Sequence, residues 1–270
     1  TGRPILYSCS WPNDGYEKHH HYEQPDVLNH GIKQTCNIWR NYYDIFDSWE
    51  SVTKIINFWK RTDPQNDVMI RAAGPGHFND PDMLVVGNPG LSLSEQQTQF
   101  SLWSIFAAPL YISADLRTIS NDSKNILLNE EIIAINQDPL GRQGWCAEDN
   151  GSKFVRVWVR ELVPATTTGN KNAADTPTQS SDTWAVVLQN YHTIFNEQPI
   201  TFDPRRHIVP SSGSGSGSGS RTITGFSVRD LIAKQELGTF QHNFTTFVDE
   251  SSVATYKIVL HYSQTTTTAT

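Results

Sequence analysis

The chain has 270 residues, of which 37% are hydrophobic and 18% charged, and it carries a formal net charge of -7 at pH 7. This composition indicates a globular protein that is large enough to bury the core of one large domain or two smaller ones. The acidic balance and the scattered Lys and Arg residues argue against a nucleic-acid partner, and no apolar run approaches the roughly 20 residues that a membrane-spanning helix needs.

The first half of the chain alternates short apolar runs with helical patterns. Residues 4–9 and 38–44 predict two buried strands. Asp47-Ser48-Trp49-Glu50 then predicts the start of a helix, with an N-cap at Asp47 and an acidic residue three positions on. The apolar stripe of that helix comprises Trp49, Val52, Ile55, Ile56 and Trp59. A third buried strand is predicted over residues 68–73, before a Gly-Pro-Gly turn.

The alternation continues to residue 135. Ser92 and Glu95 predict a capping box for a helix that stops at Pro109. A fourth strand over residues 110–113 and a last helical stretch over residues 120–135 follow. Strands and helices that alternate at this spacing, with strands apolar on both faces, are typical of parallel βα units.

After residues 136–141 the pattern changes to period-two segments rich in Val, Trp, Thr and Tyr, which predict an antiparallel β domain. The expected strands are residues 154–159, 184–188, 226–231, 244–248 and 254–260. Low-complexity pieces at residues 164–182 and 211–220 predict flexible loops. The second piece alternates Ser and Gly, and is either an engineered linker or a natural repeat.

Polar residues follow the predicted parallel strands at the points where the strands end. Asp44 ends one strand, Ser10-Trp11-Pro12 follows another and Asp80-Pro81-Asp82 follows a third, so these side chains are expected to converge above one sheet. Two carboxylates there suit glycoside hydrolysis, which needs a proton donor and a group that stabilises or attacks the anomeric carbon. Arg40 is suited to hydrogen bonding with sugar hydroxyls, and the nearby tryptophans are suited to stacking on the C–H faces of a sugar. The alternative is that these aspartates only cap helices or turns.

Cysteines and glycosylation motifs bear on the compartment. Cys9 and Cys36 each lie at the edge of an apolar segment, which leaves open a disulfide in an oxidising compartment or buried free thiols. Cys146 is the odd cysteine. The Asn-x-Ser/Thr motifs, which are possible glycan acceptors, begin at Asn121, Asn150 and Asn243.

Two short patterns resemble ligand sites only superficially. His19-His20-His21, with Glu23 and Asp26 nearby, predicts a solvated loop rather than a metal site, because consecutive histidines in regular structure cannot all face one ion. Gly74-Pro75-Gly76 lacks the Gly-Lys-Ser/Thr that completes a phosphate loop. The sequence therefore predicts no metal site.

Long strings of the chain resemble a known family. YSCSWP, CNIWRNYYDIFDSW, AAGPGHFNDPDMLVVGN, FAAPLYISADLRTIS and IAINQDPLGRQG are similar to the eukaryotic lysosomal α-galactosidase and α-N-acetylgalactosaminidase family of retaining glycoside hydrolases, family twenty-seven. The likeness is dense from Gly2 to Gly144 and thin afterwards, through VRDL and LGTF. It implies an α/β plus all-β fold: the later half of a (β/α)8 TIM barrel over residues 1–143, roughly strands five to eight, then an antiparallel β-sandwich over residues 144–270.

The resemblance also implies roles for individual residues. Asp44 takes the position of the general acid/base, and Arg40 that of a residue that grips the sugar hydroxyls and the nucleophile. Asp82 matches an aspartate that binds sugar hydroxyls, with Met83 beside it on the pocket wall, and Trp11 belongs to the same substrate-binding set. Cys9 and Cys36 match disulfide-linked cysteines. Family members need no metal or organic cofactor, and a homodimer with a lysosomal or secreted location is expected.

Sugar preference depends on the segment that follows the first strand. Galactosidases of the family carry Glu at the position of Ser10, whereas N-acetylgalactosaminidases carry Ser, which leaves room for an acetamido group, so Ser10 favours GalNAc. The second specificity position, Leu or Ala in the family, aligns with Asn13, which matches neither. Asp14 stands where an aromatic residue is usual, so the loop 11–24 is divergent. Galactose and GalNAc both stay open.

The family nucleophile, an aspartate in a Lys-x-Asp-x-Cys type motif at the end of the fourth barrel strand, has no counterpart in the sequence. The N-terminal Thr1-Gly2-Arg3-Pro4, directly before an apolar run, is typical of a chain cut from something longer. A half-barrel has two open parallel edges and an uncovered core, so this chain alone is expected to be inactive, and either unstable or in need of a partner. Completed, it is expected to hydrolyse terminal α-GalNAc or α-galactose of glycolipids, glycoproteins or oligosaccharides; the alternative is an inactive carbohydrate-binding relic.

Overall fold

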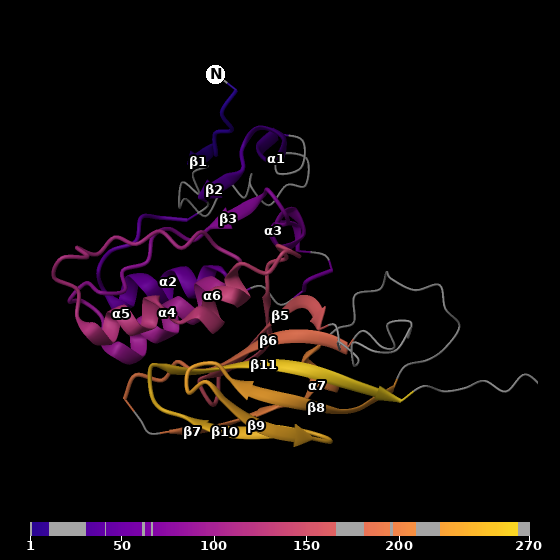
Figure 1. The fold of residues 1–270 in the computed structure, drawn as a ribbon. Coiled ribbons are helices and arrows are strands. Elements are labelled where there is room, and N and C mark those ends of the chain that lie inside the picture. The colour runs from indigo at the N-terminus through magenta and orange to yellow at the C-terminus, as the bar shows by residue number, and fades with distance from the viewer. Residues whose placement is uncertain are drawn as a thin grey trace, which may run out of the picture.

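The computed structural model describes residues 2–10, 31–40, 42–60, 63–65, 67–165, 181–194, 197–208 and 222–263. Trp11, Asn13, the histidines at 19–21, the loop 211–220 and most of the loop 164–182 lie outside these residues. A small parallel sheet, a set of helices and a large antiparallel sheet lie one above another (Figure 1). No helix in the described ranges is long and apolar enough to span a membrane.

A parallel sheet with strand order β1-β2-β3 forms the N-terminal layer. Its strands are β1 (Ser8–Ser10), β2 (Ile38–Arg40) and β3 (Phe78–Asp80). The strands are in register, so their last residues, Ser10, Arg40 and Asp80, lie side by side. The parallel arrangement predicted from the sequence is confirmed for these strands, although β2 ends four residues before the predicted end at Asp44.

The first half of the described chain contains six helices. They are α1 (Lys33–Thr35), α2 (Trp49–Phe58), α3 (Val68–Ala72), α4 (Leu93–Ile105), α5 (Asn121–Leu127) and α6 (Glu130–Asn136). Of these, α2, α4, α5 and α6 lie between the parallel sheet and the large sheet (Figure 1). Ser48 caps α2 by accepting a hydrogen bond from the Ser51 amide, and Ser92 and Glu95 form the predicted capping box of α4. The α4 cap is therefore confirmed, whereas α2 begins one residue later than predicted, because Ser48 rather than Asp47 is its N-cap.

The predicted strand over residues 68–73 is wrong, because α3 occupies this segment. The Asp67 carboxylate accepts hydrogen bonds from the amides of Met69 and Ile70, at 2.9 and 3.1 Å, and so caps a helix. Met69, Ile70 and Ala72 are buried in the helical turn. A short apolar run fits a buried helix as well as a buried strand, and periodicity alone cannot separate the two.

Two further predictions differ from the structure. Residues 110–113 form no strand, and only one isolated parallel bridge joins Ile112 to Leu84. The predicted helix over residues 120–135 is divided into α5 and α6, because Asn129 caps α6 by accepting hydrogen bonds from the amides of Glu131 and Ile132. The Asn129 amide group also donates to the Leu231 carbonyl at 2.9 Å, which anchors this break to the large sheet.

The C-terminal part is antiparallel, as predicted. The large sheet has the order β4 (Trp145–Asn150), β5 (Val155–Ala165), β6 (Ser181–Asn190), β11 (Ser252–Ser263), β8 (Thr222–Asp230) and β9 (Gln235–Phe240). A second sheet pairs β7 (Gln198–Phe202) with β10 (Phe244–Val248), and α7 (Pro204–His207) follows β7. The five expected strands are present, whereas β4, β7 and β9 were not predicted. The strand β9 is almost entirely exposed, and its sequence has no alternation of apolar and polar residues that could have revealed it.

The central strands of the large sheet are buried on both faces. On one face, Val157 and Ile258 pack in a core with Phe202 of the small sheet. On the other face, Trp158 joins the core of the helical layer, where its ring lies 5.5 Å from that of Phe106. The helices that support the parallel strands therefore rest on the antiparallel sheet (Figure 1).

Gly144 lies where the helical layer meets the large sheet, and its replacement by alanine is expected to destabilise the fold. Its amide donates to the Ile105 carbonyl at 2.8 Å, and an added Cβ would lie 2.5 Å from the Val159 carbonyl oxygen. Gly144→Ala should lower the free energy of unfolding by about 2 kcal/mol through overpacking. Chemical denaturation measures the loss. The control is Gly151→Ala, whose new Cβ would meet only the Tyr191 hydroxyl at 3.9 Å; equal losses in the two variants would contradict the packing argument.

Candidate active site

The ends of the parallel strands bring together most of the polar residues singled out in the sequence. Ser10, Arg40 and Asp80 form one row across the ends of β1, β2 and β3. Asp44 follows β2 and Asp82 follows β3. The predicted convergence above one sheet is present for these residues, and Ser10 is exposed at the end of the row.

Arg40 joins two of the carboxylates. Its Nη1 donates to Asp82 Oδ2 at 2.9 Å, and its Nη2 donates to Asp44 Oδ1. The Asp82 side chain is 11% exposed, whereas the Asp44 side chain is 69% exposed. One carboxylate is therefore held inside the site, and the other lies at its rim, where an incoming molecule can reach it.

Asp82 is held by several further hydrogen bonds. Its Oδ2 accepts from the Ile45 amide at 2.9 Å, and its Oδ1 accepts from the Met83 amide at 2.8 Å. Its carbonyl oxygen accepts from Trp103 Nε1 of α4 at 2.8 Å. Met83 itself is 38% exposed beside Asp82. The contact from Trp103 was not predicted, because no local pattern links residues so far apart in the chain.

Asp80 is the most deeply buried carboxylate of the group, with 7% of its surface exposed. Burial raises its pKa from 3.8 to about 6, and the charge of Asp82 acts in the same direction. The hydrogen bond from the Asp82 amide and the charge of Arg40 oppose this rise. Asp80 Oδ1 accepts from that amide at 2.8 Å, across Pro81. The Asp-Pro-Asp pattern therefore forms an Asx-turn, closed by the hydrogen bond from the Asp82 amide to the Asp80 side chain. A turn role for these aspartates was the alternative that the sequence left open.

Asp80→Asn is expected to stabilise the chain at pH 8 and to have little effect at pH 4. A pKa raised by folding means that the protonated carboxyl favours the folded state, and this contribution is lost as the pH rises through about 6. Asparagine keeps an acceptor for the Asp82 amide without the ionisation, so the gain at pH 8 should be on the order of 2 kcal/mol. Denaturation midpoints at both pH values measure it. A gain of the same size at both pH values would contradict the role of ionisation.

A pocket of about 380 Å³ opens beside Asp44. It is lined by the residues around Asp44 and by the first turns of α2. Tyr43 and Phe46 in its wall are 50% and 69% exposed. Aromatic faces next to a reachable carboxylate are suited to stacking on the apolar faces of a sugar.

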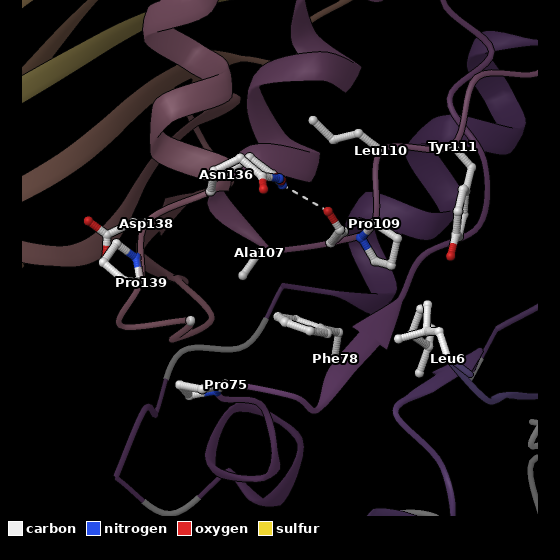
Figure 2. A pocket seen from close by; sticks show the side chains of 14 residues that line it. Leu6, Pro75, Phe78, Ala107, Pro109, Leu110, Tyr111, Asn136, Asp138 and Pro139 are labelled. Atoms are coloured by element: carbon white, nitrogen blue, oxygen red, sulfur yellow. Dashed lines mark hydrogen bonds between the residues drawn. The ribbon is translucent and has the colours of Figure 1, made fainter. Parts of the chain in front are cut away.

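A second pocket, of about 410 Å³, lies at the opposite end of the parallel strands (Figure 2). Ile38 and Phe78, which begin β2 and β3, line it together with Leu6, Pro109 and Tyr111. The Asn136 side chain points toward the segment before Pro109 and donates to the Ala108 carbonyl at 2.8 Å (Figure 2). Its wall is mostly apolar, and it does not include Arg40, Asp44 or Asp82.

The cysteines and glycosylation motifs have defined environments. Cys9 and Cys36 form the disulfide that the resemblance implies, and it ties β1 to the segment before β2. Cys146 is free and buried, and burial raises the pKa of its thiol to about 12, so it is unreactive. Asn121 and Asn243 are exposed, while Asn150 is half-buried. Within the described residues, no group of three or more His, Cys, Asp or Glu side chains could hold a metal ion.

Carboxylates gathered at the carboxyl ends of parallel strands are the arrangement that glycoside hydrolases of the barrel type use. A family model described as alpha galactosidase A, of the melibiase type, matches residues 1–138. These residues are just over half of the chain, so the chain belongs to this family. Its relatives are named as α-N-acetylgalactosaminidases and α-galactosidases, which are glycoside hydrolases.

Curated relatives match part of the chain closely. The α-N-acetylgalactosaminidase of Gallus gallus is 50% identical over 166 residues, which cover 61% of this chain and 38% of the relative. The Homo sapiens α-N-acetylgalactosaminidase is 51% identical over 163 residues, covering 60% and 37%. Homo sapiens α-galactosidase A is 47% identical over 162 residues, covering 60% and 35%. The chain therefore spans less than two fifths of the length of these relatives.

Solved structures show the same fold over nearly the whole chain. Alpha-galactosidase I from Mortierella vinacea has a TM-score of 0.67 and 24% identity, with 95% of this chain and 59% of that chain covered. The α-galactosidase of Saccharomyces cerevisiae with raffinose has a TM-score of 0.66 and 18% identity, with 96% and 65% covered. The likeness extends through the antiparallel part, where the sequence resemblance was thin.

Proposed function

We propose that this chain is part of a retaining exo-glycosidase that removes terminal α-linked GalNAc or galactose from glycolipids, glycoproteins or oligosaccharides. The observation that carries the proposal is the contact of one arginine, Arg40, with both Asp44 and Asp82 at the carboxyl ends of parallel strands. This pair combines an exposed carboxylate with a buried, oriented one. The family to which the chain belongs supplies the substrate class.

Asp44 would act as the general acid and then as the general base. It protonates the glycosidic oxygen, and afterwards removes a proton from the water that releases the sugar from the enzyme. Asp82 and Arg40 bind sugar hydroxyls, and Arg40 keeps the Asp44 carboxylate directed into the site. Retention requires a nucleophilic carboxylate at about 5 to 5.5 Å from Asp44 in the completed site.

That nucleophile would come from an N-terminal half-barrel outside this chain. Three features support this proposal: the chain spans 35–38% of its relatives, β1 and β3 are both edge strands within the described sheet, and the pocket at the strand starts is lined by apolar side chains such as Leu6 and Phe78. In a closed barrel, side chains from the other strands fill this interior. Residues 1–143 would then be barrel and residues 144–270 the β-sandwich.

The preference for one sugar would be set at the end of β1. Ser10 is exposed and neighbours Arg40 in the register of the sheet. Its short side chain leaves room for an acetamido group, which supports GalNAc, while galactose also fits. Relatives of both specificities match the chain at similar identity.

A homodimer in the lysosome or outside the cell belongs to the same proposal. The disulfide between Cys9 and Cys36 and the exposed motifs at Asn121 and Asn243 support passage through an oxidising, glycosylating compartment. Secretion of a glycosylated dimer, measured by glycosidase-sensitive mobility and light scattering, would support this part.

The test is to assay the chain as it stands beside an extended chain, in which the N-terminal half of a family member precedes it. Nitrophenyl α-GalNAc and nitrophenyl α-galactose are the substrates. Activity in the extended chain alone supports a severed retaining hydrolase, and the ratio of the two rates gives the sugar preference. If neither form turns over, the hydrolase proposal fails and a binding protein remains; activity in the short chain would mean that the nucleophile lies within these 270 residues.

A further inference from the structure

Asp82 has an unfavourable backbone conformation. Its φ is 76°, in the left-handed region that few residues other than glycine adopt, although Asp and Asn do so more often than the rest. Such strain persists only where the surroundings fix the residue from several sides, and it is concentrated at functional sites. Five hydrogen bonds restrain Asp82: one from its amide, one to its carbonyl oxygen and three to its carboxylate.

The bond to the amide comes from Asp80. Asp80 Oδ1 accepts from the Asp82 amide at 2.8 Å, and Pro81 between them has a fixed φ and no amide hydrogen of its own. Asp80 is anchored, because it ends β3 in register with Arg40. A carboxylate that accepts an amide hydrogen makes a stronger bond than a neutral acceptor does.

The site residues form one chain of contacts that starts at this bond. Asp80 holds the amide of Asp82, Asp82 Oδ2 meets Arg40 Nη1 at 2.9 Å, and Arg40 Nη2 meets Asp44. If the backbone at Asp82 relaxed to negative φ, its carboxylate would turn away from Arg40. Arg40 would then lose the contact that directs its other nitrogen to Asp44.

We propose that Asp80 is a positioning residue of the active site: its buried carboxylate fixes Asp82 in the left-handed conformation, and through Asp82 and Arg40 it orients Asp44. The catalytic consequence of this assignment rests on the proposed function, whereas the hydrogen bond between Asp80 and the Asp82 amide is independent of it. Asp80 touches no reacting atom in this scheme. Its effect on sugar binding and on proton transfer passes through Asp82.

A double-mutant cycle in the extended chain tests the assignment, with Asp80→Ala, Asp82→Asn and the double variant. Because a misplaced site costs about 100-fold, Asp80→Ala should lower kcat/KM on the nitrophenyl glycosides by about that factor. In the Asp82→Asn background the same change should cost less than about threefold, since residues that act through one another are not additive. Asp80→Asn keeps the acceptor and should stay within about fivefold of the parent.

Asp47→Ala is the matched control. Asp47 Oδ2 also accepts a backbone amide, that of Gly90 at 3.0 Å, but it has no contact with Asp82 in the described structure. Its loss should change kcat/KM less than about threefold. Equal losses for Asp80→Ala and Asp47→Ala, or additive losses in the cycle, would overturn the positioning role.

Stability separates this inference from the proposed function. A second double-mutant cycle compares the denaturation midpoints of the parent and the three variants without the extension. If Asp80 holds Asp82, the shifts in midpoint that the two single substitutions cause should not add up in the double variant. If the extended parent hydrolyses neither glycoside, the proposed function fails, and the stability cycle alone decides whether Asp80 fixes Asp82. Additive shifts in the denaturation midpoint would refute the role of this contact, whether or not the extended chain is active.

Discussion

Asp44→Asn in the extended chain is expected to lower kcat by about 1000-fold on glycosides with poor leaving groups, the upper part of the range for general acid catalysis. An alkoxide leaves slowly unless it is protonated as the glycosidic bond breaks, and the carboxamide of asparagine is not acidic enough to supply that proton. A nitrophenolate leaves without this help, so the first step on nitrophenyl substrates should be affected less than on alkyl glycosides. The ratio of the two losses is the measurement.

The variant should fold normally, which keeps the result interpretable. Asparagine has the shape of aspartate and can still accept the hydrogen bond from Arg40 Nη2. The Asp44 side chain is 69% exposed, so losing its charge should change stability by less than about 1 kcal/mol. Asp47→Asn, three residues along the same loop, is the control and should keep its activity. Ordinary activity of Asp44→Asn on an alkyl glycoside would rule out the acid/base role.

Local chemistry made parts of the fold predictable. Ser92 and Glu95 mark the start of α4 because their capping contacts span only three residues. The strand β11 was predicted because apolar side chains, Tyr256, Ile258 and Leu260, alternate along it. The segment 68–73 was misread because the buried turn α3 is too short for helical periodicity to appear, and the cap at Asp67 was the only contrary signal.

The candidate site shows the same limit. The motifs pointed to Arg40, Asp44 and Asp82, because Arg40 and Asp44 are close in the chain and Asp82 follows the strand that pairs with the strand of Arg40. The left-handed conformation of Asp82 and its support from Trp103 depend on how α4 packs against the end of β3. Neighbouring residues cannot encode such packing, so the role of Asp80 became visible only from the structure.

Arg160→Ala is expected to destabilise the protein by about 2 to 4 kcal/mol, because it removes hydrogen bonds to buried carbonyls and leaves a cavity. Arg160 has no exposed surface, and its guanidinium donates to the carbonyls of Ser104 and Asn136. These carbonyls belong to the last turns of α4 and α6, where the helix dipole places partial negative charge. Burial lowers the pKa of Arg160 to about 10, so it stays charged at neutral pH.

The matched control is Arg142→Ala. Arg142 pairs with Glu161, the neighbour of Arg160 in β5, but its side chain is 52% exposed. Its loss should cost less than about 1 kcal/mol, as for other surface ion pairs. Chemical denaturation of the two variants compares a buried arginine of β5 with an exposed one that pairs with β5, and equal losses would refute the role of the helix ends.

The same substitution tests whether the antiparallel sheet supports the site. Ser104, which Arg160 binds, follows Trp103 in α4, and Trp103 donates to the Asp82 carbonyl. Arg160 in β5 therefore fixes the helix end that holds Asp82 in its strained conformation. In the extended chain at a temperature where the variant is still folded, Arg160→Ala should lower kcat/KM more than Arg142→Ala does, because loosening α4 releases Asp82 from one side. Unchanged kinetics would mean that β1, β2 and β3 hold the site without help from the sheet below.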